Sequence, residues 1–286
     1  MKRILTGVAL ATTATLVTAT PALAAAPKNP AVAVKKKLAP GKGVKFTERT
    51  TMINGSRREI VVRRSGTFAF SKSGVAASDI TGKLNFSSSD LEKIPEGEFG
   101  DLIKAMADPE RTIRTGTTSY LSGGLWAAML PEGKTWFKAP NGPTSGVTGA
   151  FGQPLNLAET ATLKTLLKGA KPVSDGYAGK TKVGDVWKVS PWLRASLIAT
   201  PSAKAQKTLF SWRITVDKAG LPTRLLTTFP ASVVAAAKGT ISVDTRFTGW
   251  GASVSIKAPA ADDVATEFSD GSDEIPPLNV PLAGLG

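Results

Sequence analysis

Apolar and polar residues alternate along the chain from Val44 onward, which is typical of a strand with one buried face. One phase of the alternation holds Val44, Phe46, Glu48, Thr50 and Met52. The run ends at Asn54-Gly55, a strong hairpin-turn signal, and residues 57–64 predict the return strand. Further strands are expected at 66–70, 79–86, 111–121, 125–130, 134–138, 180–190, 209–216, 221–229, 239–250 and 253–257.

Other segments have helical spacing. Asn29-Pro30 predicts the start of a short helix that ends before Pro40-Gly41. A second helix is indicated by an i, i+3, i+4, i+7 stripe of Phe99, Leu102, Ile103 and Met106. A third is expected over 155–168, and its stripe is Leu163, Leu166 and Leu167. Its capping pair is Asn156 and Glu159. Residues 231–238 predict one more short helix.

The count is about ten or more strands and two to four helices, without regular alternation of strands and helices. This favours an α+β fold with a single curved antiparallel sheet, in one domain over residues 25–258. Residues 217–220 predict a second hairpin turn, and 140–154 a long loop. Residues 259–286 lose periodicity, turn acidic and contain Pro276-Pro277, so we expect a flexible tail.

Residues 1–24 have the pattern of a secretory signal peptide. Lys2 and Arg3 precede an apolar run, and Ala22-Leu23-Ala24 forms the cleavage site. Pro21 interrupts the run, so an uncleaved anchor is the weaker alternative. No Cys follows, so there is no lipobox. We therefore expect a secreted, extracytoplasmic protein with no transmembrane helix in its mature chain.

The composition excludes several chemistries, because the chain contains no His and no Cys. Ser-His-Asp and Cys-His catalysis, disulfides and Cys/His zinc sites are ruled out. Ser-x-x-Lys, Gly-x-Ser-x-Gly and phosphate-loop motifs are also absent from the sequence. A pair of carboxylates for glycoside hydrolysis stays open, since such partners meet only in the fold. We expect no enzyme activity, no cofactor and no metal.

Charge is distributed unevenly. Of the 36 bases, Lys2 and Arg3 lie in the signal segment and none follows Lys257, so residues 25–257 carry 34. Six of the 22 acids follow Lys257, which leaves 16 in that body. The excess of basic over acidic residues in this body predicts an anionic membrane or cell-wall surface as a partner. The alternative is that the basic surface is only solvated. Nucleic acid is not expected, because export and the lack of interleaved aromatic residues both argue against it. We expect a monomer.

The order of features resembles a known family. The carrying motifs are Gly-Lys-Thr-Trp-Phe-Lys (133–138), Val-Asp-x-x-Gly-Leu-Pro-x-Arg (216–224) and Gly-Trp-Gly-x-x-Val-x-Ile-x-Ala-Pro (249–259). Residues 29–265 are similar to the actinobacterial LppX/LprG-type lipoproteins and, more distantly, to the LolA-like lipoprotein carriers. The resemblance implies a half-barrel with helices on its concave side and an apolar cavity that holds a lipid or lipidated molecule. The chain departs from the family in lacking its anchoring Cys.

Such a cavity would have one helical wall and one sheet wall. We expect the helical wall from Phe99, Leu102, Met106, Leu163 and Leu166, and the sheet wall from Trp126 and Met129. In a fully packed protein the same residues are simply core. Two functions follow: a lipid-binding carrier of the cell envelope, or an envelope interaction or sensor module with the same fold and no ligand. A cavity of roughly several hundred Å³ distinguishes the first from the second.

Overall fold

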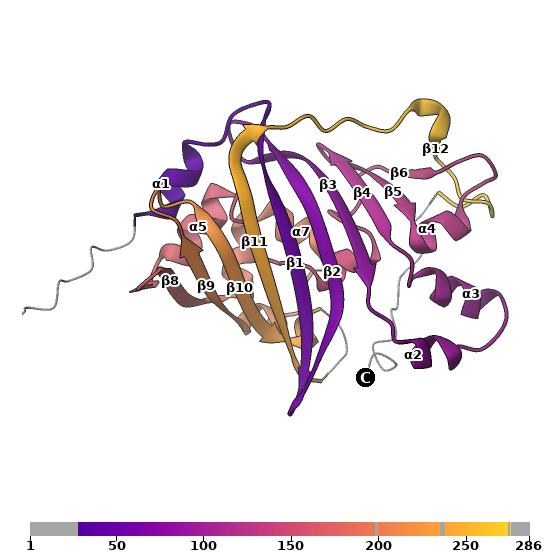
Figure 1. Ribbon diagram of the computed structural model, residues 1–286, viewed down its shortest axis with the longest axis horizontal. Coiled ribbons are helices and arrows are strands. Elements are labelled where there is room, and N and C mark those ends of the chain that lie inside the picture. Colours follow the sequence, from indigo (N-terminus) through magenta and orange to yellow (C-terminus); the bar gives the residue numbers. More distant parts are fainter. Residues whose placement is uncertain (1–27, 198–199, 235–237, 274, 276–286) are drawn as a thin grey trace, which may run out of the picture.

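The strands form one twelve-stranded sheet in the computed structural model, which describes residues 28–197, 200–234, 238–273 and 275 (Figure 1). The strand order is β12-β6-β5-β4-β3-β2-β1-β11-β10-β9-β8-β7, and every neighbouring pair is antiparallel except β12 and β6. The strands are β1 (Lys42–Asn54), β2 (Arg57–Phe70), β3 (Val75–Leu84), β4 (Glu110–Thr115), β5 (Thr118–Gly123), β6 (Trp136–Ala139), β7 (Lys171–Val173), β8 (Gly176–Lys182), β9 (Leu209–Val216), β10 (Pro222–Pro230), β11 (Thr240–Ser253) and β12 (Val264–Ala265).

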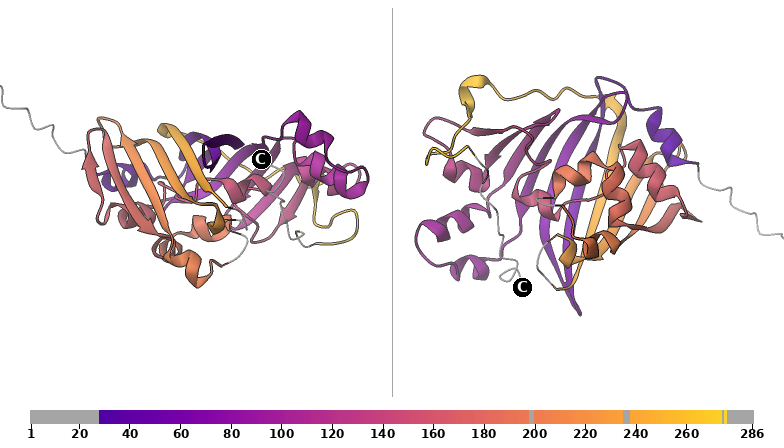
Figure 2. Two further views of the ribbon diagram at one scale, coloured as in Figure 1. Left: turned by 90° about the horizontal axis from the view of Figure 1, so that it is seen from below. Right: turned by 180° about the vertical axis from the view of Figure 1, so that it is seen from behind.

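Helices α5, α6 and α7 cover one face of the sheet, which Figure 2 shows from behind. Helices α2, α3 and α4 lie beside the β4–β6 end. The α-helices are α1 (Pro30–Lys35), α2 (Ser88–Glu92), α3 (Glu98–Ala105), α4 (Gly124–Met129), α5 (Thr160–Leu167), α6 (Val183–Val189), α7 (Pro191–Ser196) and α8 (Ala203–Lys207). Short 3₁₀ turns are η1 (Val147–Phe151), η2 (Ala231–Val233) and η3 (Ala261–Asp263). The predicted α+β class with a single curved sheet is confirmed.

The period-two pattern of β1 separates the two faces of the sheet. Val44 and Phe46 are buried on the helix-covered side, called the inner face below, whereas Lys45 and Arg49 are exposed on the opposite, outer face. The large side chains of the core, such as Phe210, belong to the inner face or to the helices packed on it. Burying this apolar surface is the main stabilising contribution to the fold.

Both predicted hairpin turns are present. Asn54 pairs with Arg57 across the first, where Gly55 has φ +58°. Gly220 has φ +84° in the second, between β9 and β10. Both glycines thus adopt a left-handed backbone conformation, which residues with a Cβ adopt only at an energetic cost. The predicted start of α1 is also correct, because Asn29 Oδ1 accepts a hydrogen bond from the Ala31 amide at 2.9 Å.

Several local predictions differ from the structure. The strands expected at 57–64 and 66–70 are one strand, β2, and the strand expected at 111–121 is divided into β4 and β5. The strand expected at 253–257 is not formed, because β11 ends at Ser253. Residues 125–130 were expected as a strand but lie mostly in α4, because an uninterrupted apolar run suits a buried helix as well as a buried strand. The strand predicted over 180–190 ends at Lys182 and continues as α6. The helix expected from Asn156 begins at Thr160, and Asn156 instead accepts a hydrogen bond from the Ala158 amide in the preceding turn.

The segment expected as a flexible tail contributes to the sheet. Within it, β12 pairs with β6, and Phe268 stacks on Phe137 with ring centroids 3.9 Å apart. The expected signal peptide, 1–24, and residues 276–286 lie outside the described residues. Of the helix predicted over 231–238, η2 is present and residues 235–237 are also outside that description.

Candidate functional site

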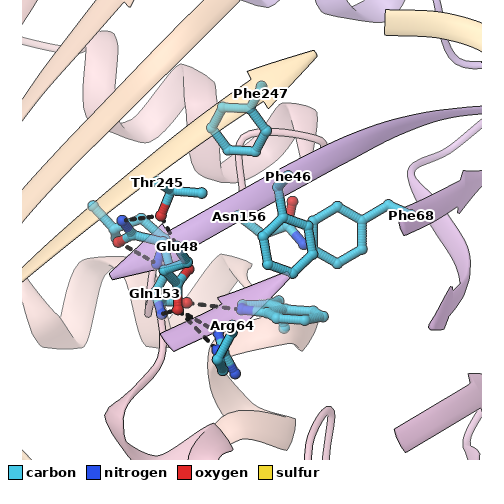
Figure 3. A pocket seen from close by; sticks show the side chains of 10 residues that line it. Phe46, Glu48, Arg64, Phe68, Gln153, Asn156, Thr245 and Phe247 are labelled. Atoms are coloured by element: carbon cyan, nitrogen blue, oxygen red, sulfur yellow. Dashed lines mark hydrogen bonds and ion pairs between the residues drawn. The ribbon is translucent and has the colours of Figure 1, made fainter. Parts of the chain in front are cut away.

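A small pocket lies between the inner face of the central strands and the segment that covers it (Figure 3). The strands supply Phe46, Glu48, Arg64, Phe68, Thr245 and Phe247. Residues 152–159, called the cover segment below, supply Gln153, Leu155 and Asn156, and α7 supplies Trp192. The strand residues come from β1, β2 and β11. The volume of the cavity is about 10 Å³. That is about the room one water molecule requires.

Aromatic rings form the apolar part of the pocket. Phe46 and Phe68 stack with centroids 4.8 Å apart, and Phe68 meets Trp192 edge to face at 5.2 Å. Figure 3 shows the two phenylalanine rings side by side, with Phe247 on the neighbouring strand. The Trp192 Nε1 group donates to the Gln153 carbonyl at 3.0 Å, which ties α7 to the cover segment. Four aromatic rings thus surround an opening that is too small for an acyl chain as it stands.

The polar part of the pocket is a buried ion pair. Both Arg64 Nε and Nη2 lie 2.8 Å from Glu48 Oε1, and the two side chains are 2% and 1% exposed. Glu48 Oε1 also accepts from the Gln153 amide at 3.1 Å, while Oε2 accepts from Thr245 Oγ1 at 3.0 Å. Both carboxylate oxygens are therefore engaged, which suits holding the sheet to the cover segment better than acid–base chemistry. Removing either charge would leave the other buried and unpaired.

One polar atom of the pocket is unsatisfied. The Asn156 Nδ2 group is buried and has no hydrogen-bond partner among the described residues. Its Oδ1 accepts from the Ala158 amide at 2.9 Å, which orients the side chain. A buried donor without a partner is energetically costly, and a water or a ligand acceptor would satisfy it. The pocket therefore presents one free donor beside an aromatic wall.

Glu159 holds the cover segment together next to the pocket. Its Oε2 accepts from Ser190 Oγ at 2.5 Å and from Thr162 Oγ1 at 2.7 Å, and Oε1 accepts from the Trp192 amide at 2.7 Å. Burial raises the pKa of the Glu159 carboxyl, and the hydrogen bonds from Ser190, Thr162 and Trp192 oppose that rise. This carboxyl joins the start of α5 to the start of α7 and so positions the Trp192 ring.

The seven residues predicted to line a cavity fall into two groups. Leu102 and Met106, at α3, lie beside Trp126 and Met129 of α4, whereas Leu163 and Leu166 are fully buried in α5 toward the other end of the sheet. The side chain of Phe99 is outside the described residues. None of the other six is among the described residues that line the pocket. Their role in ligand binding stays a prediction.

Trp126 was expected on a strand and lies instead in α4, where its indole has a buried hydrogen-bond partner. Its Nε1 donates to Glu110 Oε2 at 2.9 Å, and the same carboxylate accepts from the amides of Val147 and Thr148 at 2.9 and 2.8 Å. Glu110, the first residue of β4, thereby caps the start of η1. The tryptophan belongs to this buried hydrogen-bonded cluster and is completely inaccessible to solvent.

Sequence reasoning did not select any of the pocket residues, although one signal was present. Glu48 occupies the inward phase of β1, between Phe46 and Thr50, where an unpaired charge would be expensive to bury. Such a residue demands a partner, and Arg64 supplies it from the inward phase of β2. Gln153 and Trp192 carry no comparable signal, because only the tertiary fold brings them to the strands.

Across the described ranges, there is no cluster of three or more acidic side chains placed to hold a metal ion. No helix in the same residues has the length and hydropathy needed to span a membrane.

No protein-family model matches the chain, and no curated protein matches it. Solved structures with some similarity include a LolA superfamily protein from Nitrosomonas europaea, at 10% identity and a TM-score of 0.34 over 78% of this chain and 91% of that one. A hypothetical protein from Chlamydia trachomatis is 9% identical, with a TM-score of 0.27 over 80% of this chain and 98% of that one. A DUF1329 family protein from Desulfovibrio piger is 12% identical, with a TM-score of 0.24 over 79% of this chain and 92% of that one. TM-scores of this size assign no activity, and the fold described above rests on this chain's own strand order.

Proposed function

We propose that the protein is an exported, non-catalytic binding protein that takes a hydrophobic ligand between the inner face of the sheet and its helical cover. The observation that carries this proposal is the pocket on β1, β2 and β11, where four aromatic rings surround one unpartnered amide donor. Ligand sites are commonly apolar with a few polar groups that fix orientation. A ligand with an apolar body and one hydrogen-bond acceptor, such as an acyl ester or amide, has the matching chemistry.

Binding requires the pocket to widen, because its present volume of about 10 Å³ accepts no chain. The strand side is held by continuous pairing of β1 with β2 and β11, so the movable wall is the cover segment with Trp192. That wall is held to the strands by the Glu48 contact to the Gln153 amide, by the hydrogen bond from Gln153 Nε2 to Thr245 Oγ1, by the hydrogen bond from Thr50 Oγ1 to the Phe151 carbonyl and by ring packing. The resemblance to LppX/LprG-type lipoproteins supports the same arrangement, with the ligand carried in the cell envelope.

The second candidate is an envelope interaction or sensor module with the same fold and no ligand. The small pocket volume favours it, since a preformed carrier cavity would be larger by more than tenfold. In that case Asn156 satisfies its donor with a single buried water.

A titration with a fluorescent fatty-acyl probe separates the two candidates. Phe247→Trp should fill the pocket and lower probe affinity at least about tenfold, because one added ring exceeds the free volume. Phe229→Trp is the matched control: Phe229 is also buried on an inner-face strand but does not line the pocket. It should leave probe affinity unchanged. A wild-type protein that binds no probe, or an equal loss in both variants, would contradict the carrier proposal and favour the interaction module.

A further inference from the structure

The outer face of the sheet carries a concentration of basic side chains on its central strands. Lys45 and Arg49 project from β1, Arg63 from β2, Lys83 from β3 and Arg246 from β11, and all five are exposed. These five residues are called the outer basic face below. Figure 1 views the molecule down its shortest axis, with these strands toward the viewer and helices α5 and α7 behind them. The face is thus on one of the two broad sides of the protein.

The strand register sets several of these bases directly opposite one another. Arg49 pairs with Arg63 across β1 and β2, and Arg63 pairs with Lys83 across β2 and β3. Arg246 lies opposite Arg224 of β10. Like charges at directly opposed positions destabilise a sheet. The fold therefore tolerates repulsion at three neighbouring pairs on one surface.

Acidic residues on this face neutralise only part of the charge. Asp244 accepts from Arg224 through two hydrogen bonds of 2.7 and 2.8 Å and lies 3.9 Å from Arg49, so two bases share one acid. Within the described chain, Lys45, Arg63, Lys83 and Arg246 form neither an ion pair nor a side-chain hydrogen bond. Four cations on the central strands are therefore free to meet an external anion.

We propose that the outer basic face docks the protein onto an anionic phospholipid surface. The free bases spread in two dimensions, over four neighbouring strands from β11 to β3, as a planar layer of headgroups requires. A linear polyanion would instead be matched by a groove or a single row. The outward positions between the bases are polar, with Thr47 and Ser65 as examples, so binding is electrostatic and lacks an inserted apolar anchor. The interaction leaves the helical cover directed away from the membrane.

Vesicle sedimentation tests this surface with the purified exported protein. It should bind vesicles of equal phosphatidylglycerol and phosphatidylcholine, fail to bind pure phosphatidylcholine, and dissociate as salt is raised. Each base beside an anionic leaflet contributes about a fivefold factor in partitioning. The triple variant Arg63→Gln, Lys83→Gln and Arg246→Gln should therefore lose about a hundredfold in partition coefficient.

The matched control removes the same charge on the helical side. Lys164→Gln, Lys168→Gln and Lys207→Gln alter three exposed lysines at α5 and α8, and should lower binding much less than the outer triple. Equal loss in both triples, or no binding of the wild type to the anionic vesicles, would overturn the proposal. Binding to soluble polyphosphate without binding to vesicles would also overturn it.

Two further readouts keep this test independent of folding and of the pocket. The outer triple should unfold at the same or a higher urea concentration than the wild type, because it removes opposed like charges; a marked decrease would contradict the repulsion described above. Phe247→Trp, which fills the pocket, should bind anionic vesicles as the wild type does. Failure of the acyl-probe test and failure of vesicle binding are thus separate results.

Discussion

Replacing Arg64 with Met tests the buried ion pair that joins the sheet to its cover. The substitution removes both contacts to Glu48 Oε1 and leaves a carboxylate that is 1% exposed without a cation. Breaking a buried pair in this way costs about 3–5 kcal/mol in the free energy of unfolding. Gly152 packs directly against the guanidinium, where a Cβ would overlap Arg64 Nη2, so the arginine head group fills this space in the folded protein. We therefore expect a loss within that range.

A second substitution separates the lost charge from the lost packing. In the double variant Glu48→Gln and Arg64→Met, the amide oxygen can still accept from Gln153, and no charge is left buried. The double variant should therefore be more stable than Arg64→Met alone by about 2 kcal/mol or more. Arg63→Met is the matched control, because Arg63 is adjacent in sequence but exposed on the outer face, and it should change stability by less than about 0.5 kcal/mol.

Urea unfolding followed by circular dichroism measures these differences, with equal m values required before free energies are compared. A loss below about 1 kcal/mol in Arg64→Met would contradict the burial of this ion pair, because it would mean that water reaches the carboxylate. The absence of any rescue in the double variant would refute it equally, since the orphaned charge would then not be the cause.

Three other predictions follow from single features. The pKa of Glu159 is raised in the folded protein, so between the ordinary Glu pKa and the raised value the folded state holds a proton that the unfolded chain has lost. The stabilising contribution of this group is therefore complete below the ordinary Glu pKa and is lost as pH rises through the raised value. Glu159→Gln should abolish this pH dependence of the unfolding free energy, and an unchanged dependence would contradict the prediction. Gly220→Val should destabilise the protein by about 1 kcal/mol or more, and by more than Gly55→Val. Both glycines have positive φ, but a Cβ added at Gly220 would lie only 2.8 Å from the Cβ of Lys28, whereas a Cβ at Gly55 would meet no other atom within 4 Å. Equal urea midpoints for the two variants would contradict this prediction. If the signal peptide is cleaved as expected, the intact mass of the protein recovered from the culture medium should match a chain that begins at Ala25; recovery of the full chain in the membrane fraction would show an uncleaved anchor instead.

Local patterns predicted those parts of the fold that depend on neighbouring residues. The alternation from Val44, the Asn54-Gly55 turn and the Asn29 cap each specify their element through contacts a few residues apart. The strand prediction for 125–130 was wrong because apolar residues without polar interruption show neither the period of a strand nor that of a helix. In the helix that forms there, the Trp126 indole donates to the Glu110 carboxylate of β4, a contact that the run itself does not reveal.

The candidate site was much less accessible to sequence reasoning than the sheet. Glu48 in the inward phase of β1 indicates a buried charge, but nothing local identifies Arg64 as its partner or Gln153 as its second contact. The pocket exists because the segment after η1 and the start of α7 fold over the central strands, and that placement depends on Glu159 bridging α5 and α7. Contacts of this kind join residues more than 30 positions apart and leave no periodic trace.

Native mass spectrometry of the protein purified from its own host shows whether a ligand occupies the pocket. We expect the wild-type protein to retain a hydrophobic molecule, Phe247→Trp to release it, and Phe229→Trp to keep it. A folded wild-type protein that carries only its own mass, with no bound molecule before or after addition of an acyl lipid, would contradict ligand binding at the pocket on β1, β2 and β11.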